Sequence, residues 1–161
     1  ALGDALAVAL LDARGFREED FARSHPGGAL GRKLLTHIDD VMRTGDAIPA
    51  VGLQAGFTEL MREMSSKGLG ASAIVDDARQ VRGIFTDGDL RRLIEKGVDL
   101  RSSKAADVMH PNPRTLRAGA LAVEAVAMME QYRITSVLVV DDAGVLCGAL
   151  NSNDLLRAKV I

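Results

Sequence analysis

The sequence predicts an α+β (mixed α/β) fold in which one β-α-β-β-α unit occurs twice, as a pseudo-two-fold pair. The first observation is an internal repeat, since residues 148–154 have the same layout as residues 83–89, 65 positions earlier. The second is the order of apolar patterns, which alternates short extended runs with helical ones identically in both copies. A unit of about 60 residues is longer than the common solenoid periods, so we expect two packed units and not an array.

Composition bounds the class of protein. The 161 residues are 47% hydrophobic and 26% charged, which is typical of a globular chain. The net charge of −2 gives no electrostatic reason to expect a nucleic acid or an anionic membrane as partner. The single cysteine, Cys147, cannot form a disulfide framework or a cysteine-based metal site within one chain. A cytoplasmic location is therefore expected, and no metal site is predicted.

Residues 1–36 are expected to be the helical tail of a preceding, missing domain. Residues 1–11 have an apolar helical face with no convincing cap in front of it, and Gly15 would end that helix. Residues 24–35 follow, with three glycines and a proline that indicate an irregular loop. His25 in this loop is a candidate acid/base group, and a solvated linker histidine is the alternative.

The first unit is assigned to residues 37–99. A helix is predicted from apolar residues at i, i+3, i+4 and i+7, beginning at Phe57, and Gly68 and Gly70 close it. A second helix should end at Gly97. In order, the expected elements are an extended piece at 48–51, this first helix, strands at 71–75 and 80–85, and a helix at 86–96.

The second unit, residues 100–161, repeats the order. Within this unit, two prolines, Pro111 and Pro113, force an extended or turning path before the first expected strand. The expected elements are a strand at 114–116, a helix whose apolar face begins at Ala122, strands at 135–140 and 145–150, and a helix at 151–160. One unit alone is near the size at which a core is marginal, so we expect the two to pack sheet to sheet and leave two related clefts.

The candidate ligand-binding residues lie at the corner between the last strand and the last helix of each unit. Thr86 occupies a helix N-cap position, and Asp89 follows three residues later. Free N–H groups at a helix start suit a phosphate, whereas a carboxylate can accept two hydrogen bonds from a ribose diol. The alternative is an ordinary cap with acids favoured by the helix dipole. The recurrence of the corner at Asn151 and Asp154 favours a nucleotide clamp.

The doubled unit resembles a pair of cystathionine-β-synthase (CBS) domains, also called a Bateman module. The strand-end pattern Gly-h-h-Ser/Thr-x-x-Asp, with h apolar, is present at residues 83–89, and the resemblance covers residues 37–161. It implies that the aspartate binds ribose hydroxyls and the hydroxyl residue lies near phosphate. Asn151 stands where Ser or Thr is usual, so equal occupancy of the two clefts does not follow. The ligand-binding residues implied are Thr86, Asp89, Asn151, Asp154, Ile48, Pro49, Ala71, Ser72, Thr115, Arg133, Thr135 and Ser136.

The whole chain is also similar to D-arabinose 5-phosphate isomerases. The resemblance rests on residues 1–11, on Ser-His-Pro-Gly-Gly-Ala-Leu-Gly-Arg-Lys-Leu-Leu at 24–35, and on residues 40–46 and 84–92. It implies a sugar isomerase (SIS) domain ending at 1–36, CBS domain 1 at 37–99 and CBS domain 2 at 100–161. The implied reaction interconverts D-ribulose 5-phosphate and D-arabinose 5-phosphate through an enediol without a metal cofactor, for Kdo and lipopolysaccharide biosynthesis. His25 would then be catalytic, but only together with the missing domain.

Three functions remain open at this point. The first is a regulatory, nucleotide-sensing module whose effector is an adenine nucleotide such as AMP or ATP, or else CMP-Kdo. The alternative is a purely structural dimerisation module without a physiological ligand, and the third is a catalytic fragment. The resemblance further implies contact with the chain's own SIS domain, a homodimer through the CBS pairs, and a tetramer of the full-length protein.

Overall fold

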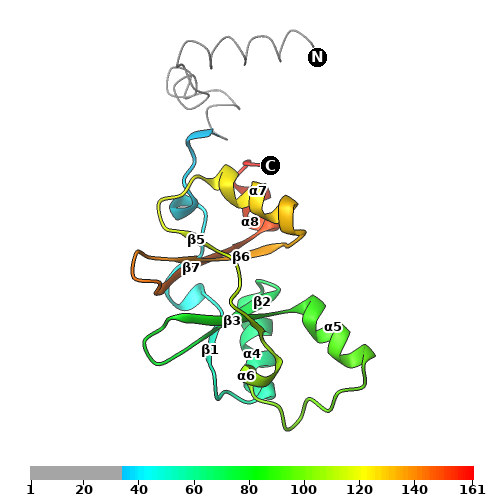
Figure 1. The fold of residues 1–161 in the computed structure, drawn as a ribbon. Helices are drawn as coiled ribbons and strands as arrows, with labels where there is room; N and C mark the ends of the chain where they lie inside the picture. The colour runs from blue at the N-terminus through cyan, green and yellow to red at the C-terminus, as the bar shows by residue number, and fades with distance from the viewer. Residues whose placement is uncertain (1–33) are drawn as a thin grey trace.

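Residues 34–161, which the structure describes, form two small sheets that each carry their own helices (Figure 1). In this computed structural model the first sheet has the strand order β1-β2-β3-β4 and the second has the order β5-β6-β7. The predicted α+β fold of two similar units is therefore confirmed. The expected helix at 1–11 and the loop with His25 lie outside the described residues.

The first repeat follows the predicted order, after two 3-10 turns, η1 (Ile38–Asp40) and η2 (Gly45–Ala47). Its elements are β1 (Ala50–Gly52), α4 (Phe57–Lys67), β2 (Ala71–Val75), β3 (Val81–Thr86) and α5 (Asp87–Glu95). Strand β1 pairs parallel to β2, and β2 pairs antiparallel to β3. As predicted, Gly68 ends α4, with the positive φ of 66° that glycine tolerates best.

The second repeat has the same order. Its elements are α6 (Ala105–Val108), β4 (His110–Pro111), β5 (Thr115–Arg117), α7 (Ala122–Tyr132), β6 (Ser136–Val140), β7 (Leu146–Asn151) and α8 (Ser152–Arg157). Again the first strand of the repeat, β5, is parallel to β6, and β6 is antiparallel to β7. The last helix is shorter than the predicted 151–160, because the chain leaves it before Lys159, which has a φ of 61°.

The two repeats exchange their leading segments, which the sequence did not predict. Arg43, which precedes β1, pairs with Ala149 of β7 through N–H···O bonds of 2.8 and 3.2 Å. In the other direction, β4 pairs antiparallel to β3, with His110 opposite Ile84. Each sheet is therefore extended by a segment that belongs, in sequence, to the other repeat.

The core has three parts, and the middle part joins the repeats. Ile48, Ala71 and Ile84 of the first repeat are buried together with Leu138 and Ala149 of the second. Packing of sheet against sheet is thus confirmed. Outer clusters lie under the helices of each repeat, and they too are mixed, because the leading segments cross over. Within residues 34–161, no helix is both long and apolar enough to cross a membrane.

Candidate functional site

The first strand-to-helix corner lies at the junction of β3 and α5. Thr86 is the N-cap of α5, and its Oγ1 accepts a hydrogen bond of 3.1 Å from the Asp89 N–H. In return, the Thr86 N–H donates to Asp89 Oδ2 at 3.0 Å, which completes a capping box. Asp89 Oδ1 accepts a bond of 2.5 Å from Arg92, whose side chain is 63% exposed. Both residues lie at the helix start where the sequence placed them, and Asp89 Oδ1 faces a surface guanidinium.

The second corner repeats this geometry in a more buried setting. Asn151 is the N-cap of α8 and exchanges hydrogen bonds of 2.9 and 3.0 Å with Asp154. The Asn151 amide also donates to the Leu69 carbonyl of the first repeat at 3.1 Å. Both side chains are buried, whereas Thr86 and Asp89 are only partly so. The amide of asparagine at this N-cap therefore adds a contact between the repeats.

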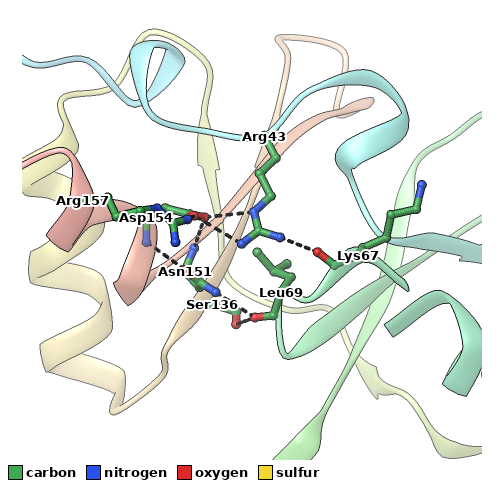
Figure 2. Close-up of polar contacts among 7 residues, drawn as sticks. All are labelled: Arg43, Lys67, Leu69, Ser136, Asn151, Asp154 and Arg157. Atoms are coloured by element: carbon green, nitrogen blue, oxygen red, sulfur yellow. Dashed lines mark hydrogen bonds and ion pairs between the residues drawn. The ribbon is translucent and has the colours of Figure 1, made fainter. Parts of the chain in front are cut away.

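Arg43 closes the second corner from the first repeat (Figure 2). Its Nε and Nη2 donate to the two oxygens of Asp154, each at 3.2 Å, while Nη1 donates to the Lys67 carbonyl at 2.7 Å. Arg157 of α8 donates to the same carboxylate. Sequence reasoning missed Arg43, because it lies 111 positions from Asp154 and no local pattern connects them.

The other predicted site residues are divided between the corners and the core. Ala71 lies opposite Thr86 in the β2–β3 register, and Ser136 lies opposite Asn151 in β6–β7, so strand pairing brings these to the corners. Ser136 Oγ also points at the Leu69 carbonyl, 3.5 Å away.

Among the remaining candidates, Thr135 reaches the second corner through its backbone, because its carbonyl accepts a bond of 3.0 Å from the Ser152 N–H. Ile48, Pro49 and Ser72 are buried, and the Ser72 hydroxyl donates to the Ala73 carbonyl at 3.1 Å. Thr115 is half-buried in β5, whereas Arg133 and Thr135 are exposed where α7 gives way to β6. Strand pairing and burial therefore do not connect these side chains to either carboxylate.

A cleft of about 440 Å³ opens between the two repeats beside both corners. It is lined by Met61, Met64, Ser65, Gly68, Leu69, Gly70, Asp87, Leu90, Asn151 and Asn153. Of the predicted residues, only Asn151 reaches it. Asp87 and Asn153, from the first turns of α5 and α8, were missed, although their place beside the two caps was a usable signal. The polar groups on its wall come from both repeats.

The thiol of Cys147 on β7 is harder to ionise than an ordinary cysteine thiol. Burial raises the pKa of its thiol, and the negative charges of Asp141 and Asp39 raise it further. A raised pKa lowers the thiolate fraction, and the thiolate is the reactive form. In the structure, the Cys147 side chain packs against the core of the second repeat.

Comparison with known proteins identifies the class. The CBS domain family matches residues 38–96 and residues 105–161, which together are most of the chain. The chain therefore belongs to the CBS domain family and carries the domain twice, as the strand-end motif had indicated.

The chain is also 54% identical, over 160 residues, to the arabinose 5-phosphate isomerase KdsD of Escherichia coli strain K12. This match covers 99% of the chain and 48% of that enzyme, so the chain spans about half the length of this relative. The resemblance to arabinose 5-phosphate isomerases that was inferred from the sequence is confirmed as a relationship of sequence.

Solved structures confirm the fold. The CBS domain pair of protein MJ0100, in complex with 5′-methylthioadenosine and S-adenosyl-L-methionine, has a TM-score of 0.67 and 20% identity, covering 76% of this chain and 94% of that one. CBSX2 in complex with AMP has a TM-score of 0.64 and 21% identity, covering 76% and 95%.

Proposed function

We propose that this chain is the regulatory, nucleotide-sensing CBS pair of an arabinose 5-phosphate isomerase, and that a ribonucleotide binds at the Thr86–Asp89 corner. The observation that carries the proposal is the Asp89 carboxylate. It is oriented by the Thr86 N–H and partly exposed, and among residues 34–161 its one other hydrogen-bond donor is the surface residue Arg92. Similar folds bind AMP, 5′-methylthioadenosine and S-adenosyl-L-methionine, all of which carry a ribose diol.

The charges at this corner decide how a nucleotide lies. Asp87 and Asp89 both occupy the first turn of α5 and oppose a phosphate at that helix start. A carboxylate accepts hydrogen bonds from vicinal hydroxyls without such a conflict. The ribose therefore lies against Asp89. The phosphate points away from the first turn of α5, into a position that the exposed Arg92 can reach.

Two ligands satisfy this chemistry, an adenine nucleotide and CMP-Kdo. Both present a ribose diol, and they differ in the base and in the sugar acid. Sequence identity to an enzyme named arabinose 5-phosphate isomerase supports a parent that interconverts D-ribulose 5-phosphate and D-arabinose 5-phosphate. CMP-Kdo would then report the output of the Kdo pathway as feedback. His25 would serve catalysis only together with the sugar isomerase domain, and this chain alone would be inactive.

Asp89→Asn should weaken binding of the cognate ribonucleotide by roughly 10- to 100-fold, because one charged acceptor of the diol is lost. Isothermal titration of AMP, ATP, CMP and CMP-Kdo identifies the ligand and measures the loss. Asp107→Asn is the matched control, since Asp107 at the start of α6 likewise accepts a 3.0 Å bond from the backbone N–H of its N-cap residue, Lys104. A 2′-deoxy analogue should bind weakly to the native chain and lose little more in Asp89→Asn. Absence of binding by all four nucleotides would instead favour the structural module.

We also expect homodimers through the helices, and a tetramer of the full-length protein. Ile94 on α5 and Leu156 on α8, large apolar side chains on the corresponding helices of the two repeats, are 62% and 59% exposed and are candidates for a dimer contact. The double variant Ile94→Glu with Leu156→Glu should sediment as a monomer in analytical ultracentrifugation where the native chain is a dimer. Arg101→Glu, in an exposed loop, is the control that should change nothing. A native chain that is monomeric at all concentrations would contradict the dimer.

A further inference from the structure

The two strand-to-helix corners differ in how many hydrogen bonds their aspartates already accept. The Asp154 carboxylate accepts from the Asn151 N–H and Arg43 Nε on one oxygen, and from Arg43 Nη2 and Arg157 on the other. An ionised carboxylate offers about four lone-pair sites, so Asp154 is fully used. Its side chain is 6% exposed. No acceptor remains for a ribose diol.

Asp89 has acceptor sites to spare. Within the described part of the chain, its hydrogen bonds come only from Thr86 and Arg92, both at its own corner. The residue that corresponds to Arg43 in the second copy is His110, 67 positions later. His110 lies in β4 and is exposed. Replacement of an arginine by a histidine at this one position therefore leaves the first corner open.

Arg43 connects three elements. Its backbone pairs with Ala149 of β7, two of its nitrogens hold Asp154 of α8, and its third donates to the carbonyl of Lys67. Lys67 is the last residue of α4, where free carbonyls and the negative end of the helix dipole favour a cation. The guanidinium thus satisfies a helix end in one repeat and a carboxylate in the other.

We infer that the Asp154 corner is a closed latch between the repeats and that Arg43 occupies, from within the chain, the place that a ligand diol takes at Asp89. Only the first corner is then available to a nucleotide, and a ligand at the second must first displace Arg43. The bidentate geometry and the burial of the Asp154 carboxylate make this pair strong in a way that the exposed Arg92–Asp89 pair is not. The claim about stoichiometry rests on the proposed function, but the latch itself does not.

A thermal double-mutant cycle tests the latch without any ligand. Arg43→Met and Asp154→Asn should each lower the midpoint of unfolding by about 10 °C. Arg43→Met leaves the buried Asp154 carboxylate with Arg157 as its remaining cation in the described part of the chain, and Asp154→Asn leaves the half-buried guanidinium without its charged partner. The double variant should have a midpoint of unfolding close to that of the less stable single variant. Arg92→Met and Asp89→Asn form the matched control, in which each midpoint should shift by about 2 °C at most and the two shifts should add.

Arg43→Lys keeps the charge and loses the bidentate geometry, so an intermediate shift is expected if the methionine variant does not fold. An Arg43→Met midpoint within about 2 °C of native, or shifts that simply add in the double variant, would overturn the latch.

Titration with AMP and with CMP-Kdo tests the stoichiometry. The native chain should bind one equivalent, Asp89→Asn should weaken that site by the roughly 10- to 100-fold expected above, and Asp154→Asn should leave its affinity unchanged. Arg43→Met, studied below its midpoint, should expose a second site. Two equivalent sites in the native chain, or loss of the single site in a folded Asp154→Asn variant, would contradict the inference. Failure of every variant to bind would contradict the proposed function, while the midpoint cycle would still decide the latch.

Discussion

Phe85→Ala is expected to lower the free energy of unfolding by about 3 to 5 kcal/mol, measured by urea denaturation followed by circular dichroism. The Phe85 side chain is fully buried at the end of β3. It packs in the core of the first repeat with Leu60 and Ile74, and its ring meets Phe57 edge to face at 6.1 Å between centroids. Truncation loses the transfer energy of the ring and leaves a cavity that a short β-strand cannot close.

The second repeat supplies the control for this substitution. Leu150 is the residue that corresponds to Phe85, and it too is fully buried. Phe85→Leu therefore introduces the side chain that the second repeat has at this position. It should lower the free energy of unfolding by only about 1 to 1.5 kcal/mol. A loss below about 1 kcal/mol for Phe85→Ala would mean that the ring does not support the native state as its burial indicates.

The strand-to-helix corners could be predicted from sequence because their geometry is local. A hydroxyl or amide residue three positions before an acid specifies a capping box through bonds between near neighbours. Thr86 with Asp89, and Asn151 with Asp154, form those boxes. The strands could be predicted equally well, because each strand is specified by its own alternating or apolar run. The internal repeat also shows each of these patterns twice.

The contacts between repeats could not be predicted in this way. Repeat symmetry alone would pair His110 with Asp89 just as Arg43 pairs with Asp154, and the structure shows only the latter. One feature of the sequence is related to the crossing of the leading segments. The equivalent residues Asp40 and Asp107 are 67 positions apart, whereas equivalent residues of the two corners are 65 positions apart. Such an indel marks a connection that differs between copies, but its direction depends on packing at long range. Asp154 was predicted as a ligand-binding residue from its local motif, and that motif carries no information on the bonds that its oxygens accept from Arg43.

The same crossing explains the glycine that opens the strand-end motif. A Cβ on Gly83 would lie 2.8 Å from Cγ and 2.9 Å from Cβ of Met109, with the sulfur closer still. Met109 follows α6 and thus comes from the second repeat, while Gly83 is buried on β3 of the first. At the other corner, Met42 from the first repeat covers Gly148 in the same manner. The glycines are needed because the exchanged segments press directly on the strand backbone.

Gly83→Ala should therefore destabilise the chain by about 2 to 3 kcal/mol in urea denaturation, despite the backbone entropy that alanine normally saves. Rotation of the methionine side chain cannot relieve the clash, because the Met109 Cβ itself is involved. Gly52→Ala on β1 is the control, since nothing lies within 4 Å of its added Cβ, and it should be neutral or slightly stabilising.

Met109→Ala, combined with Gly83→Ala, removes the sulfur and Cγ from this contact and should leave the double variant more stable than the sum of the two single losses by at least about 1 kcal/mol. Because the two side chains belong to different repeats, this coupling also measures how strongly the exchanged segments bind the halves into one cooperative unit. If the two losses add without coupling, or if Gly83→Ala behaves like Gly52→Ala, the segment with Met109 does not press on β3, and the crossing of the repeats in solution differs from the one described.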